Sequence, residues 1–201
     1  MSSNSVTVRR AATDAPILML VYGILRLVDG FDGHRGPGLA WNLGHVAFFA
    51  AMVLFGVLAL ALAESRGAES RSAGGRSAGS RKLAAIAAGA TVFGVACFLW
   101  VIAGDLSAGF RESMPLPEPL QAAGPMAFTL GMLTLLGLQV AARRAPFWSP
   151  LLFGAAIAAI TVNLDLLPLA ALLLVAACAP LAKSNRQDRQ IGNVQTARAL
   201  H

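Results

Sequence analysis

Long apolar runs are the feature that most constrains the fold of this chain. Several of them approach or exceed the roughly 20 residues that an α-helix needs to cross a bilayer. Hydrophobic residues make up 56% of the 201 residues and charged residues only 13%, whereas a soluble domain carries about 25% charged residues. The sequence therefore predicts an all-α, polytopic membrane protein whose first partner is the lipid bilayer, with no separate soluble domain.

We expect six transmembrane helices, which together form one domain over residues 16–182. Their predicted ranges are 16–30, 39–63, 83–105, 121–142, 147–163 and 166–182. The last two come from a single long apolar run that Asn163, Asp165 and Pro168 interrupt at its centre. Proline is tolerated in the first turn of a helix, and the residue before it resists the α conformation. This run is therefore expected to form a tight hairpin.

Basic residues predict the orientation of the bundle. Arginine and lysine gather in the N-terminal arm 1–15, in the linker 65–82, at 143–144 and in the tail 183–201. Six spans place all four segments on one face, which the positive-inside rule assigns to the cytoplasm. We therefore expect both termini inside the cell, a multi-pass location in the plasma membrane, and no signal peptide. The linker and the tail are expected to be disordered.

Several classes of function lack their sequence signals. The net charge of +6 comes from the basic residues in the segments outside the apolar runs, where they set the topology. We expect no nucleic-acid partner, because no nucleic-acid module accompanies these segments. There is no HExxH, CxxC, EF-hand, P-loop, G-x-G-x-x-G or DDxxD spacing, and the GxSxG spacing of GRSAG (75–79) lies in the predicted linker and not in a nucleophile elbow. We therefore expect no metal and no cofactor. Cys97 and Cys178 lie inside apolar runs and are expected to be buried packing residues.

Acidic residues gather at the predicted outer face. Asp29, Asp105 and Asp165 each lie where an apolar helix meets a loop, one in each of three consecutive helical hairpins. A carboxylate at the C-terminal end of a helix opposes the helix dipole, so a cation, a partner or a proton is expected to compensate it. The similar segments WNLGH (41–45) and FTLGM (128–132) suggest that the hairpins repeat. In this alignment Met132 stands in the place of His45.

The first hairpin carries the densest group of polar residues. Arg26 lies three residues before Asp29, and Tyr22 lies one turn deeper on the same helix face. A local Arg–Asp pair at the membrane boundary is one explanation. The other is that these residues line a cavity together with His45, because ionisable residues inside a membrane are functional candidates.

Tryptophan and histidine side chains extend this group. Trp41 and His45 are four residues apart and share a helix face, and Trp100 lies near the outer end of the third predicted helix. For the two tryptophans, the structural alternative is the aromatic belt of the membrane interface. For His45, it is a core histidine that is bonded to a neighbouring helix.

These residues support an enzyme hypothesis. Desolvation favours the protonated form of a carboxylic acid in an apolar cavity, and such a group can act as a general acid towards an alkene or epoxide in a lipid-soluble substrate. Asp29 or Asp105 would be the acid and Arg26 would tune it, while aromatic faces would stabilise a carbocation. The expected substrate-binding residues are Tyr22, Trp41, His45, Trp100, Phe128 and Asp165.

In helix count and in its outer acidic residues, the chain resembles the small integral-membrane terpene cyclases of actinobacterial and fungal natural-product pathways. The segment PLPEP (115–119) is similar to the proline-and-glutamate motif of heterodimeric membrane carotenoid cyclases, but it lacks the second acid of that motif. The resemblance implies metal-independent cyclisation of an isoprenoid that is dissolved in the membrane.

Two other functions remain open on the sequence alone. In a transporter or sensor, the outer acids would collect a cation, although the predicted inner halves of the helices offer few polar residues. In a non-catalytic membrane subunit, the small residues at 84–90 and 154–160 would support close helix packing. That packing could lie within the chain or mediate self-association.

Overall fold

The computed structural model describes residues 3–31, 33, 35–72 and 78–183. Within these ranges the chain is helical and contains no strand. The elements are α1 (Ser3–Asp29), α2 (Leu39–Ser72), α3 (Ala78–Leu106), α4 (Ala108–Ser113), α5 (Glu118–Ala141), α6 (Trp148–Val162), the 3-10 turn η1 (Leu164–Leu166) and α7 (Leu167–Lys183). The predicted all-α class is confirmed.

Five of these helices are long and apolar enough to cross a membrane: α1, α2, α3, α5 and the continuous η1–α7 segment. Helix α6 is apolar but has only 15 residues, or about 22 Å at 1.5 Å per residue. That length is below the roughly 30 Å of a bilayer core. Asn163 separates α6 from η1, so the last apolar run forms the predicted hairpin.

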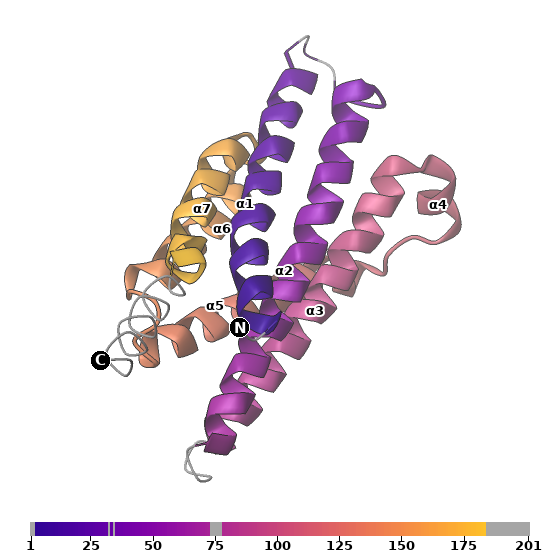
Figure 1. Ribbon diagram of the computed structural model, residues 1–201. Coiled ribbons are helices and arrows are strands. Elements are labelled where there is room, and N and C mark those ends of the chain that lie inside the picture. Colours follow the sequence, from indigo (N-terminus) through magenta and orange to yellow (C-terminus); the bar gives the residue numbers. More distant parts are fainter. Residues whose placement is uncertain (1–2, 32, 34, 73–77, 184–201) are drawn as a thin grey trace.

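The helices form a closed ring (Figure 1). Each long helix packs against the next one along the chain, and α7 returns to pack against α1. The short helix α4 packs against α3 beside the α3–α5 connection. The centre of the ring is filled by buried side chains, among them the aromatic rings of Phe55, Phe128 and Phe153.

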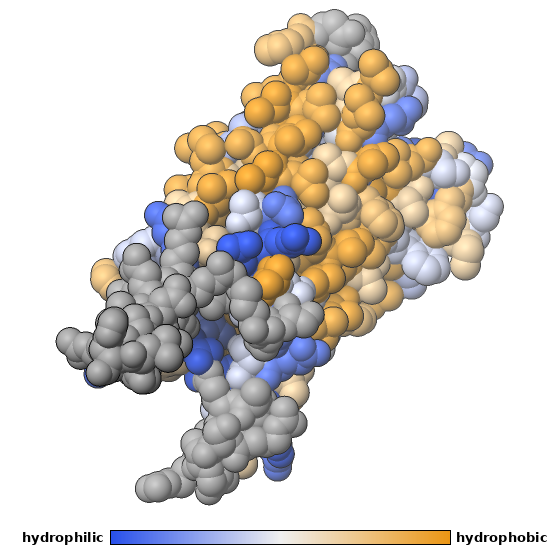
Figure 2. Space-filling view, viewed as in Figure 1, coloured by the Kyte–Doolittle hydropathy of each residue, from blue (hydrophilic) through white to orange (hydrophobic). Residues whose placement is uncertain are grey.

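Apolar side chains also cover the outside of the ring (Figure 2). On α1 they recur at helical spacing as Ile17, Val21, Ile24 and Val28, all of which are at least 39% exposed. In water such a continuous apolar surface would be costly. In a bilayer it faces lipid tails, and this agrees with the length and composition of the five long helices.

Helices α1, α2 and α3 are longer than predicted, and tertiary contacts stabilise the extensions of α1 and α2. Residues of the expected N-terminal arm belong to α1, where Ala11, Ala12 and Ala15 are buried. The Asn4 side chain also donates a hydrogen bond to the carbonyl of Ala61, at 3.2 Å. The helix therefore runs through Pro16, where the sequence analysis places its start.

The linker predicted at 65–82 is mostly helical in the described residues. Helix α2 continues to Ser72 and α3 begins at Ala78, since adding residues to an existing helix costs little once the helix has nucleated. The Arg66 guanidinium donates to the carbonyl of Leu138 and ties this extension to α5. Residues 73–77 and the tail 184–201 lie outside the described residues, so the prediction of disorder stays a prediction there.

Helices α3 and α5 pack with their backbones in contact. A methyl group added to Gly131 would lie 2.5 Å from the carbonyl oxygen of Ala87, and one added to Gly94 would lie 2.5 Å from the carbonyl oxygen of Gly124. Cys97 is buried on this interface, against Gly124. Small residues of this kind allow membrane helices to approach closely and to gain van der Waals contact.

We predict that Gly131→Ala destabilises the bundle by about 1–3 kcal/mol, because the added methyl must push two backbones apart. The matched control is Gly137→Ala on the same helix, where no atom lies within 4 Å of the added methyl. This control is expected to be neutral or more stable, since alanine favours helix by roughly 1 kcal/mol. Thermal unfolding in detergent measures both changes, and equal effects of the two substitutions would contradict the close packing.

Candidate functional site

The three hairpin acids lie at one end of the bundle, and the loop between α1 and α2 links two of them. Asp29 accepts a hydrogen bond from the backbone N–H of Gly36, at 3.3 Å. Arg35 of the same loop donates to Asp165 before α7, at 2.6 Å. Arg35 thus supplies the expected cation for Asp165, whereas Asp29 receives a hydrogen bond from a neutral backbone N–H.

Arg26 does not pair with Asp29 in the described part of the chain. Its side chain hydrogen-bonds to the Tyr22 hydroxyl instead. The two residues line a small cavity together with Asp29, Trp41 and His45. Its volume is only about 10 Å³, which is room for about one water molecule. This cavity is too small for a substrate.

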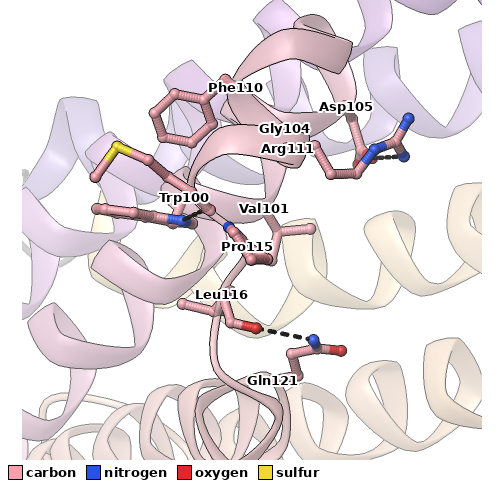
Figure 3. Close-up of a pocket in the computed structure, with 10 residues that line it drawn as sticks. Trp100, Val101, Gly104, Asp105, Phe110, Arg111, Pro115, Leu116 and Gln121 are labelled. Atoms are coloured by element: carbon pink, nitrogen blue, oxygen red, sulfur yellow. Dashed lines mark hydrogen bonds and ion pairs between the residues drawn. The ribbon is translucent and has the colours of Figure 1, made fainter.

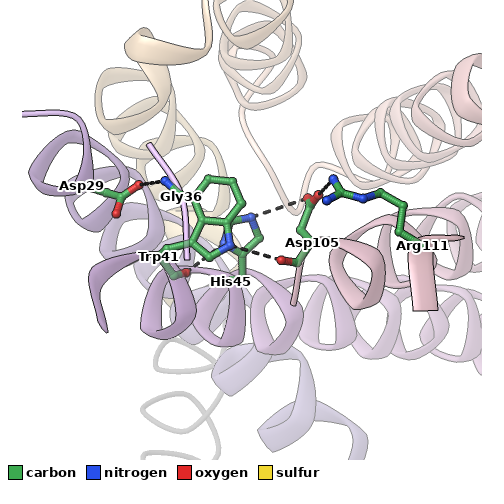
Figure 4. A network of polar contacts seen from close by, with 6 residues as sticks. All are labelled: Asp29, Gly36, Trp41, His45, Asp105 and Arg111. Atoms are coloured by element: carbon green, nitrogen blue, oxygen red, sulfur yellow. Dashed lines mark hydrogen bonds and ion pairs between the residues drawn. The ribbon is translucent and has the colours of Figure 1, made fainter. Parts of the chain in front are cut away.

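His45, on α2, contacts Asp105, the remaining acid of the three (Figure 4). His45 is 3% exposed, and its ring lies against the indole of Trp41 with the two planes tilted by 39° and 4.2 Å between ring centroids. His45 Nδ1 lies 2.8 Å from the carbonyl oxygen of Trp41. On the other side of the ring, Nε2 lies 3.6 Å from Asp105 Oδ2. The Trp41 indole N–H donates to the backbone carbonyl of Asp105, at 3.2 Å.

This geometry determines where protons can sit. A backbone carbonyl only accepts hydrogen bonds, so His45 must carry a proton on Nδ1. The opposite nitrogen, Nε2, then faces a carboxylate oxygen, and two bare acceptors would repel each other. The contact is favourable only when a proton lies on Nε2 or on Asp105. His45 is buried whereas the Asp105 side chain is 29% exposed, so the pair connects the interior of the bundle to its surface.

Arg111 on α4 completes the cluster from the outside. Its Nη1 lies 3.7 Å from Asp105 Oδ1, and its side chain is 64% exposed. Asp105 is thus flanked by a buried histidine and by an exposed guanidinium. Arg26 is the predicted tuner of the acid, but in the structure it is Arg111 that lies beside Asp105.

Asp105 also lines a groove between α3, α4 and the α3–α5 connection (Figure 3). The groove has a volume of about 210 Å³ next to Asp105 and Arg111. A second hollow of about 230 Å³ continues along α5 towards Cys97 and Pro125. The two hollows share the lining residues Val101, Leu116 and Gln121, so they adjoin, and we refer to both together as the groove. The first hollow is polar at one end, and the second is lined mainly by apolar side chains.

Aromatic side chains line the part of the groove near Asp105. The Trp100 and Phe110 rings lie 5.3 Å apart and are tilted against each other. The Trp100 indole donates to the carbonyl of Met114, at 2.9 Å, and the Gln121 amide donates to the carbonyl of Leu116, at 3.1 Å. Both bonds hold the α3–α5 connection over the groove, so the shape of the groove depends on local contacts of this connection with the ends of α3 and α5.

The structure thus separates the predicted site residues into three groups. Asp105, His45 and Trp41 form one polar cluster, and Trp100 lies in the adjoining groove. Tyr22, Arg26 and Asp29 lie at the small cavity behind His45.

The third group lies away from the groove. Phe128 is 3% exposed and packs in the core with its ring centroid 5.7 Å from those of Phe55 and Phe98. Asp165 also belongs to this group and forms an ion pair with Arg35.

Arg111, Phe110 and Gln121 are the residues of this site that sequence reasoning missed. Phe110 and Arg111 belong to α4, in the connection between the two helices of the second hairpin, which has the sequence of an ordinary polar loop, and Gln121 lies near the start of α5. The one available signal is Arg111, which is one of three arginines, with Arg26 and Arg35, at the predicted outer face. A short helix that folds back onto α3 is what brings it to Asp105.

Within the described residues, no group of three or more histidine, cysteine, aspartate or glutamate side chains could hold a metal ion. Comparison of the chain with protein-family models, with curated proteins and with solved structures gave no match.

We predict that His45 carries a proton on Nδ1. In protein labelled with ¹⁵N-histidine, the Nδ1 resonance of His45 should show the protonated form across the neutral pH range. His45→Gln should remove this signal and identify it, while His34→Gln should leave it in place. A neutral ring with its only proton on Nε2 would contradict the proton assignment for the His45–Asp105 pair.

Proposed function

We propose that this chain is an integral-membrane enzyme of the terpene-cyclase type, which acts by acid–base catalysis on an isoprenoid alkene or epoxide dissolved in the bilayer. The observation that carries the proposal is the position of Asp105. Its carboxylate contacts the buried His45 on one side and lines an aromatic groove on the other. A proton donor beside an aromatic, largely apolar groove is what such chemistry requires.

The proposal includes six membrane crossings with both termini in the cytoplasm of the cell and the Asp105 cluster on the outer side of the plasma membrane. Residues of α1 and α7 near the two chain termini line one pocket at the end of the bundle opposite the acids. An even number of crossings puts both ends of the bundle on one side of the membrane, which is consistent with a pocket that α1 and α7 share. The short helix α6 would cross a locally thinned bilayer.

The groove suits an elongated amphiphile. The polar end of a substrate would contact Asp105 and Arg111. Its hydrocarbon chain would lie between Phe98 of α3 and Leu120 of α5. Trp100 and Phe110 would face a developing positive charge near Asp105, where aromatic faces stabilise cations.

The proton would move from His45 Nε2 to Asp105 Oδ2 and then to the substrate. Protonation of an alkene forms a C–H bond and leaves a carbocation, while protonation of an epoxide oxygen breaks a C–O bond and leaves a hydroxyl group and a carbocation. Ring closure consumes the remaining double bond. Loss of a proton from a neighbouring carbon to the Asp105 carboxylate then forms a new double bond, so the reaction is an isomerisation with no net use of protons.

Transport is a weaker alternative for this architecture. The centre of the ring is packed with buried aromatic rings from α2, α5 and α6. The buried polar residues in the described part of the chain are His45, Thr91, Gln139 and Ser149. They are scattered over four helices and do not make a continuous polar path.

The proposal predicts that Asp105→Asn lowers product formation by at least about a hundredfold, since loss of a general acid typically costs 10²–10⁴ in rate. Purified protein in proteoliposomes would be offered isoprenoids ending in an alkene or an epoxide, and products would be identified by mass spectrometry. The matched control is Glu112→Gln on α4, an exposed acid outside the groove, which should retain full activity. Equal turnover by both variants, or no turnover of the panel by the unmodified protein, would contradict the proposal.

The orientation can be tested with two glycines that have open space around them. Gly109→Cys, in α4, should react with a membrane-impermeant maleimide added to intact cells. Gly79→Cys, at the start of α3, should react only after lysis. The two native cysteines are buried and give a low background. The reverse labelling pattern would place the Asp105 cluster in the cytoplasm and would overturn the predicted topology.

A further inference from the structure

The end of the bundle opposite the Asp105 cluster carries a second pocket. It lies between α1 and α7, has a volume of about 400 Å³, and is lined by Arg9, Arg10, Thr13, Asp14, Ala182 and Lys183. Nothing in the proposed reaction uses these residues. Three cations and one carboxylate leave the pocket with a formal charge of +2.

The cations of this pocket are available to a ligand. In the described part of the chain, no carboxylate lies within ion-pair distance of Arg9, Arg10 or Lys183. All three side chains are exposed. The Thr13 hydroxyl, which lines the same pocket, donates to the carbonyl of Arg9, so the donors left for a ligand are those of the three cations.

The surroundings of the pocket indicate where its ligand would come from. Polar surface near the start of α1 adjoins the broad apolar surface of the bundle (Figure 2). Ile17, one turn beyond Thr13, already belongs to the exposed apolar stripe of α1. The basic pocket is therefore placed at the boundary between apolar and polar surface, which is the depth of lipid headgroups in a bilayer.

We propose that this pocket binds the phosphate headgroup of an anionic membrane lipid. Basic pockets between membrane helices on the cytoplasmic side commonly bind such headgroups. Arginine offers forked N–H donors that match phosphate oxygens, and Lys183 adds a point charge from the neighbouring helix. A bound headgroup would bridge the first and last helices and would strengthen the contact that closes the ring. This inference is independent of the proposed enzyme activity.

The test uses the full chain in a neutral detergent, with the unfolding temperature as the readout. Phosphatidylglycerol should raise the unfolding temperature, whereas phosphatidylcholine and inorganic phosphate at the same concentration should not. The triple variant Arg9→Gln, Arg10→Gln, Lys183→Gln should lose this stabilisation. Each substitution should weaken lipid binding about fivefold, as measured by titration.

A control variant separates a defined site from general charge attraction. Arg81→Gln, Lys82→Gln, Arg143→Gln removes the same number of exposed positive charges elsewhere and should keep the response to phosphatidylglycerol. Circular dichroism would verify that both triple variants retain their helix content, and native mass spectrometry would count the lipids retained by each. Equal loss in the two variants, an unchanged response in the pocket variant, or equal stabilisation by inorganic phosphate would overturn the lipid site.

Discussion

A lipid environment offers no hydrogen bonds to a polypeptide backbone, and this constraint accounts for most of the architecture. Helices satisfy their own N–H and C=O groups, so an apolar chain in a bilayer can only cross it as helices when it does not form a barrel. Because lipid is as apolar as leucine, helix packing relies on close contact rather than on burial from water. The glycines between α3 and α5 provide such contact, and the ring closes where α7 meets α1.

The same constraint concentrates polar chemistry at the ends of the bundle. Charged side chains are costly inside the membrane unless they are paired, and at the acidic end they satisfy one another. The loop between α1 and α2 binds Asp29 and Asp165, while Trp41, His45 and Arg111 surround Asp105. Asp105 differs from the other two acids because a groove lies against it. The opposite end is basic, so one bundle carries two polar surfaces of different character.

Several residues of the candidate site could be predicted from the sequence, but the sequence could not tell which of the predicted residues lie together in one site. Intramembrane polar residues stand out against an apolar sequence, and Asp105, His45, Trp41 and Trp100 were identifiable for that reason. Phe128 illustrates the limit, since an aromatic residue in an apolar helix carries no sign of whether it faces a cavity or the core. Its place among Phe55, Phe98 and Phe153 follows from how three other helices pack around it. Arg111 shows the reverse case, a loop residue that a short helix turns back towards the acid.

The sequence by itself determined the helical class, the approximate number of membrane-compatible segments and the hairpin at residues 163–168, because length and hydrophobicity are local properties. Only the tertiary structure decided how far α1 and α2 extend, since contacts such as Asn4 with Ala61 stabilise helix beyond the apolar runs. It also decided which acid meets the histidine. Asp29 and Asp105 occupy similar positions in their hairpins, and the approach of α2 to α3 places His45 beside Asp105. Such long-range proximity depends on the packing of whole helices, which no short stretch of sequence encodes.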